Sequence, residues 1–286
     1  MTASPHRPVP IARGPTPDRG CATALSTLAA FGASTAALSA LLSLAVLPCV
    51  DLAWWRVFRR CVSIAAFASL WWITCVWKRR PLSSYGLVAS GAGNRQLRFG
   101  LLLGFAALAV MLGVSLAVGA CRVDVTADRV RLWRTLLGFL PAALLVGVLE
   151  ELVFRGLMLQ QLMGCSRGGA VALSSAVYAL VHLKSPALTV LTWTELGGLF
   201  LLGAVLSLSY LVTGQLWLAV GLHSSLAYGA RVNKLLVSFG DPSLAWLTGT
   251  SRLVNGMVGW VALGTIGGIV WWWARRAQGG CAHGKG

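Results

Sequence analysis

The sequence has few charged residues and very few acidic ones. Charged residues make up only 11% of the 286 positions, and Asp and Glu together number 8. Soluble globular domains carry about 25% charged residues, so this composition excludes an ordinary soluble domain. Hydrophobic residues make up 57% of the chain. The balance is typical of a protein that crosses a membrane several times.

The scarcity of acids leaves a net charge of +16. A strongly basic chain can indicate nucleic-acid binding. Here, however, Lys and Arg lie between apolar runs, where they meet lipid headgroups. We therefore expect the lipid bilayer as a partner and no nucleic acid. Basic residues divide almost equally between alternate loops, so the positive-inside rule leaves the membrane orientation open.

Cysteine pairs with the C-x-x-C spacing are absent among the seven cysteines. Most of these cysteines lie inside apolar segments. We therefore expect them to serve as small packing residues and not as metal ligands or disulfides.

Long apolar runs recur along the whole chain. A bilayer core requires about 20 apolar residues in helical form. We therefore expect an all-α fold, a polytopic transmembrane bundle of about eight helices. The expected spans are 22–50, 61–77, 99–120, 135–163, 169–183, 194–212, 214–230 and 254–274.

The composition divides the chain into four parts. Residues 1–21 are polar, basic and rich in Pro, which predicts a disordered tail. Residues 22–134 hold the N-terminal transmembrane helices, and their last part, 122–134, is expected to lie along the interface as an amphipathic helix. Residues 135–230 hold the next four expected spans. Residues 231–286 hold the last loop, the final transmembrane helix and the C-terminal tail.

All three glutamates of the chain fall within apolar segments: Glu150, Glu151 and Glu195. Ionisable groups in a membrane are costly and mark functional sites. Glu151 and Arg155 are four residues apart on one helix, so they are expected to pair. Glu150 points about 100° away from Glu151 and remains available as a general base for water. The alternative is an ion pair that only holds two helices together.

Two of the four histidines also lie in apolar segments. His182 shares a helix face with Tyr178, and its imidazole can share a water with Glu150 or carry a proton. His223, in a later span, can donate a hydrogen bond to the oxyanion that develops during amide cleavage. Taken singly, His182 is better explained as an interfacial residue with satisfied hydrogen bonds, and His223 is better explained by hydrogen bonding between helices.

Together these segments resemble the CPBP family, the bacterial relatives of the type II CAAX prenyl endopeptidases. That family shows E-E-x-x-x-R, F-x-x-x-H and H-x-x-x-N on successive membrane helices. This chain has EELVFR at 150–155, YALVH at 178–182 and HSSLA at 223–227. The resemblance covers residues 135–230.

The resemblance implies a glutamic-type intramembrane protease without a cofactor. In it, Glu150 and His182 activate water, and His223 stabilises the oxyanion. The residues expected to orient the site are Glu151, Arg155 and Tyr178. The implied substrate is a membrane-anchored protein or peptide, and the implied location is the cell (inner) membrane, crossed several times. Glu195 is given no role in the site.

The chain departs from the family pattern at two positions. Tyr178 stands where the family has Phe, and Ala227 stands where it has Asn. The second change removes a hydrogen-bond donor for the oxyanion. It favours one alternative, a non-catalytic CPBP-like membrane factor with an immunity or chaperone-like role.

A zinc-dependent version of the same protease is a further alternative. Its ligands would be Glu150, His182 and His223. Against it, the sequence offers no obvious acid to orient either imidazole. A proton-coupled carrier is disfavoured, because no inverted repeat is visible.

Overall fold

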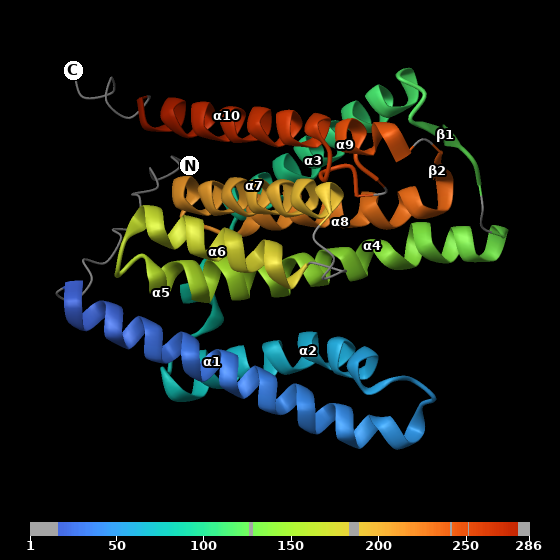
Figure 1. Ribbon diagram of the computed structural model, residues 1–286. Helices are drawn as coiled ribbons and strands as arrows, with labels where there is room; N and C mark the ends of the chain where they lie inside the picture. The colour runs from blue at the N-terminus through green and yellow to red at the C-terminus, as the bar shows by residue number, and fades with distance from the viewer. Residues whose placement is uncertain (1–16, 126–127, 183–188, 241, 251, 280–286) are drawn as a thin grey trace.

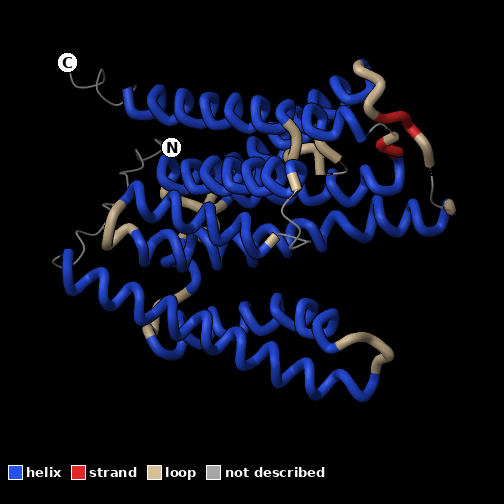
Figure 2. The backbone as a smooth tube through the Cα atoms, viewed as in Figure 1, coloured by secondary structure: helices blue, strands red, loops and turns tan. Residues whose placement is uncertain are grey.

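The structure, a computed structural model, describes residues 17–125, 128–182, 189–240, 242–250 and 252–279. Helices dominate it (Figure 2). In chain order the elements are α1 (Pro17–Val46), η1 (Leu47–Cys49), α2 (Trp54–Trp71), η2 (Trp72–Trp77), η3 (Leu82–Tyr85), α3 (Gly91–Ala117), β1 (Cys121–Val123), α4 (Arg129–Glu151), η4 (Leu152–Leu159), α5 (Gln160–Leu162), α6 (Arg167–Val181), α7 (Val190–Thr213), α8 (Trp217–Leu236), β2 (Val237–Phe239), η5 (Pro242–Leu244), α9 (Ala245–Thr248) and α10 (Met257–Gly279). The expected all-α membrane bundle is confirmed.

Each of the expected spans coincides with a helical segment, but not all of these segments have the length and composition of a lipid-facing span. Within the described ranges, five helical stretches are long and apolar enough to cross a membrane: Gly20–Cys49, Trp54–Trp77, Gly91–Ala117, Arg129–Leu162 and Val190–Thr213. The apolar helices Arg167–Val181 and Met257–Trp273 are shorter. Helix α8 has an unbroken buried stretch from Leu218 to Leu226. Because protein surrounds this stretch, α8 tolerates polar residues that lipid would exclude.

Helix α8 lies at the centre of the bundle, in contact with α3, α4 and α7. Helix α10 packs on α7 and α3, while α1 and α2 form a hairpin beside the bundle (Figure 1). Helices α3 and α8 approach closely because Gly100 faces Gly221 across the contact; a Cβ on Gly100 would lie 3.1 Å from the Gly221 Cα. Such close packing of small residues is a common way for membrane helices to associate.

A short β-ribbon replaces part of the expected interfacial helix. Strand β1 pairs antiparallel with β2, with Cys121 opposite Phe239. The expectation of a helix over 122–134 was therefore wrong at its start, and from Arg129 onward the segment belongs to α4. Residues 126 and 127 lie outside the described ranges. The cause is a pairing between distant segments, which the local periodicity does not reveal.

The N-terminal helix and one cysteine pair also differ from expectation. Helix α1 begins at Pro17, so the last part of the expected tail is helical; Pro suits the first turn of a helix. Residues 1–16 lie outside the described ranges. Cys21 forms a disulfide with Cys165, which ties the start of α1 to the turn between α5 and α6. The expectation of packing cysteines was wrong for this pair, although Cys61 and Cys121 are free and buried.

Candidate active site

The predicted pair of Glu151 and Arg155 lies at the junction of α4 and η4. Arg155 Nη1 donates to Glu151 Oε1 at 2.9 Å, and both side chains are fully buried. Arg155 Nη2 donates to the carbonyl of Gly203 on α7, also at 2.9 Å. The guanidinium carbon lies 4.9 Å from the centre of the Tyr178 ring on α6. The pair therefore links three helices, and its two charges compensate each other inside the protein.

Glu151 also contacts a histidine that is distant in sequence. Nδ1 of His223, on α8, lies 2.8 Å from Glu151 Oε1. An ionised carboxylate only accepts hydrogen bonds, so Nδ1 of His223 carries a proton and donates it to this bond. The other ring nitrogen, Nε2, then faces the Tyr178 hydroxyl at 3.4 Å and Glu150 Oε2 at 3.6 Å. The sequence predicted Arg155 as the partner of Glu151 and did not predict the contact between Glu151 and His223.

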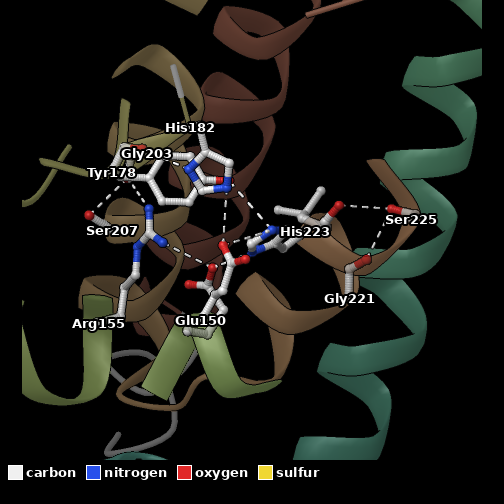
Figure 3. Close-up of polar contacts among 11 residues, drawn as sticks. Glu150, Arg155, Tyr178, His182, Gly203, Ser207, Gly221, His223 and Ser225 are labelled. Atoms are coloured by element: carbon white, nitrogen blue, oxygen red, sulfur yellow. Dashed lines mark hydrogen bonds and ion pairs between the residues drawn. The ribbon is translucent and has the colours of Figure 1, made fainter. Parts of the chain in front are cut away.

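His182 is fixed in the same way from the other side of Glu150. It is the C-cap residue that follows α6, and its Nδ1 lies 2.8 Å from the backbone carbonyl of Tyr178. A carbonyl oxygen only accepts, so Nδ1 is the donor. Nε2 of His182 therefore faces Glu150 Oε2, at 3.3 Å. The Nε2 atoms of both histidines thus face the same carboxylate oxygen of Glu150 (Figure 3).

The two glutamates differ sharply in their exposure. The side chain of Glu150 retains 31% of its accessible surface and that of His182 retains 24%, whereas Glu151 is fully enclosed. Glu150 and His182 therefore lie at the accessible side of the cluster. The opposite, enclosed side of the cluster holds the imidazole of His223 in place.

Two glycines allow the helices to pack closely enough to bring these side chains together. At Gly147, one turn before the glutamates on α4, an added Cβ would collide with the Ser224 hydroxyl of α8. At Gly203 on α7, an added Cβ would lie 2.9 Å from the Ser175 Cα of α6. The close contacts bring His223 to Glu151, and they expose the Gly203 carbonyl to Arg155.

A second ion pair adjoins the site and involves the third glutamate. Arg252 Nη1 lies 2.7 Å from Glu195 Oε1, and both side chains are mostly buried. Arg252 Nη2 donates to the backbone carbonyl of His182 at 3.2 Å. Arg252 follows α9 and lies far from the motifs in sequence. Only the presence of Glu195 in an apolar segment pointed to this pair.

The geometry bears directly on the zinc alternative. Both imidazoles have the anchored Nδ1 that is typical of metal-binding histidines, so the expectation that no acid orients them was wrong for His223. Even so, no group of three or more His, Cys, Asp or Glu side chains in the described ranges is arranged to hold a metal ion.

Comparisons with known proteins agree with the motifs. Residues 132–228 match the Rce1-like family, described as type II CAAX prenyl endopeptidase Rce1-like. Neither the curated proteins nor the solved structures give a match. The matched region contains both glutamates, Arg155 and both histidines of the site. Over residues 132–228 the chain is therefore similar to the Rce1-like CAAX proteases, which supports the resemblance that its motifs predicted.

Proposed function

We propose that this protein is an intramembrane endopeptidase that cleaves a peptide bond of a membrane-anchored protein or peptide in the cell (inner) membrane. Glu150 is the general base, His182 is the proton carrier and His223 stabilises the oxyanion. Glu151, Arg155 and Tyr178 hold these groups in position. The proposal rests on one observation above all: both histidine Nε2 atoms face the same oxygen of Glu150.

The charges of the cluster balance when His223 is protonated. Glu150 and Glu151 contribute two negative charges, and Arg155 and the His223 imidazolium contribute two positive ones. A neutral cluster is favoured in a medium of low dielectric. In this state Nδ1–H of His223 donates to Glu151, and its Nε2–H is available to an incoming substrate oxygen.

The reaction then proceeds without a covalent intermediate. Glu150 takes a proton from water as the water oxygen forms a bond to the substrate carbonyl carbon. The negative charge on the former carbonyl oxygen is stabilised by Nε2–H of His223. His182 accepts the proton from Glu150 across their 3.3 Å contact and gives it to the leaving nitrogen as the C–N bond breaks. The products are a carboxylic acid and an amine, and Glu150 is again ionised.

The test is cleavage by purified protein in proteoliposomes, with Glu150→Gln beside wild type. The amide has nearly the shape of the carboxyl group but is no base, so we expect insertion and thermal stability to be retained and cleavage to be lost. Two probes suffice: a quenched fluorescent peptide with a farnesylated CAAX end, and an unlipidated transmembrane peptide. Wild-type rates for Glu150→Gln would contradict the proposal.

A non-catalytic membrane factor is the second candidate, favoured by Ala227. It predicts that the biological effect of the protein survives the Glu150→Gln substitution. Comparing a deletion strain complemented with wild type or with Glu150→Gln separates the two. A phenotype rescued equally by both would favour the non-catalytic role.

A further inference from the structure

The hydroxyl of Tyr178 lies within the catalytic cluster, although the family pattern has Phe at this position. It is 3.4 Å from Nε2 of His223, and the whole side chain is buried, with 2% of its surface exposed. The ring is held by Phe154, Arg155 and His182, whose ring or charge centres lie 5.1, 4.9 and 4.4 Å from it. The hydroxyl is therefore held beside Nε2 of His223, the atom that is proposed to donate a hydrogen bond to the oxyanion.

The second departure of this chain from the family pattern lies on the same helix as His223, α8. Ala227 is one helical turn beyond His223 and has no polar side-chain atom. The hydroxyl of Tyr228, next to it, donates to the Leu136 carbonyl at 2.9 Å and is thus engaged on α4. Among the hydroxyl groups of the described residues, Tyr178 is the one with a contact to His223 Nε2.

We propose that the Tyr178 hydroxyl is a catalytic group, a second donor to the oxyanion that takes the place of an amide at position 227. This inference rests on the proposed function. Its contact with His223 is longer than the common 2.7–3.0 Å of a strong hydrogen bond. In the protonated state of His223 its Nε2 is itself a donor, so the Tyr178 O–H hydrogen is not given to it and is available to the charged oxygen of the tetrahedral intermediate. The hydroxyl gained at position 178 thus replaces the hydrogen-bond donor that is lost with the Asn side chain at position 227.

The test is Tyr178→Phe, which retains the ring and its packing and removes only the hydroxyl. We expect kcat to fall about 100-fold, the scale for loss of one oxyanion donor, with KM little changed. Tyr228→Phe is the matched control, because it removes a phenol outside the site, and it should retain the wild-type kcat. Adding Ala227→Asn to Tyr178→Phe should recover a large part of the lost rate.

A binding measurement tests the same point without turnover. A peptide with a phosphinate in place of the cleaved amide imitates the tetrahedral intermediate, and it should bind Tyr178→Phe more weakly by a similar factor. The parent peptide should bind both proteins alike. Unchanged kcat and phosphinate affinity in Tyr178→Phe, with Glu150→Gln inactive, would overturn this inference alone. An active Glu150→Gln would overturn the proposed function and this inference together.

Discussion

The carboxylate of Glu151 accepts a hydrogen bond from Nδ1 of His223, 2.8 Å away on another helix. The same oxygen, Oε1, also accepts from Arg155 at 2.9 Å. A permanent cation and an imidazole thus share one carboxylate, which fixes the tautomer and the orientation of His223. Two adjacent glutamates consequently have different surroundings: Glu151 is enclosed and contacts His223 and Arg155, whereas Glu150 lies at the accessible side of the cluster.

Arg155 is expected to matter more for stability than Glu150 does. Arg155→Ala leaves Glu151 as a buried charge without its cation, and breaking a buried pair in this way costs about 3–5 kcal/mol. Glu150 is partly exposed, so Glu150→Ala should cost less. Thermal unfolding of both variants in the same detergent checks this. Equal melting temperatures would show that Arg155 is not needed to compensate Glu151.

Arg252 is expected to affect catalysis through the position of His182. Arg252→Ala removes the donor to the His182 carbonyl and the partner of Glu195. We expect kcat to fall on the order of ten-fold, as for other groups that orient a catalytic side chain. Glu195→Gln leaves the bond to His182 in place and should cost less. Equal losses in the two variants, measured as kcat in proteoliposomes, would assign the effect to the ion pair alone.

Metal chelation is expected to leave the activity unchanged. The proposed proton transfers use only Glu150 and the two histidines. We therefore expect full cleavage after treatment with EDTA or 1,10-phenanthroline, and no stoichiometric zinc by elemental analysis of the purified protein. Activity that disappears with chelator and returns with added zinc would instead establish the zinc-dependent alternative.

The sequence predicted those contacts that depend on local helix geometry. Long apolar runs located the helices, and the spacing of four residues predicted the Glu151–Arg155 pair, which the structure contains. It did not predict the contact between Glu151 and His223, because the local sequence does not determine which face of α8 packs against α4. Arg252 was missed for the same reason, since its loop reaches His182 only through the tertiary fold.

The disulfide between Cys21 and Cys165 was missed because 144 residues separate the two cysteines. Its position predicts a membrane orientation, which the even distribution of basic residues left open. Disulfides persist in oxidising compartments and are rare where thiols are kept reduced. The start of α1 and the turn between α5 and α6 are therefore expected to face the outside of the cell.

Cysteine labelling in intact cells tests this orientation, because Cys49 lies at the other end of α1 and is exposed. Two variants are needed, one with Cys21 and one with Cys49 as the single remaining cysteine. A maleimide that does not cross membranes should label Cys21 in intact cells, and Cys49 only after the cells are opened. The reverse pattern would place the N-terminal end of α1 inside. In the expected orientation the end of α6, with His182, lies toward the cytoplasm, so Glu150 would meet substrates from that side.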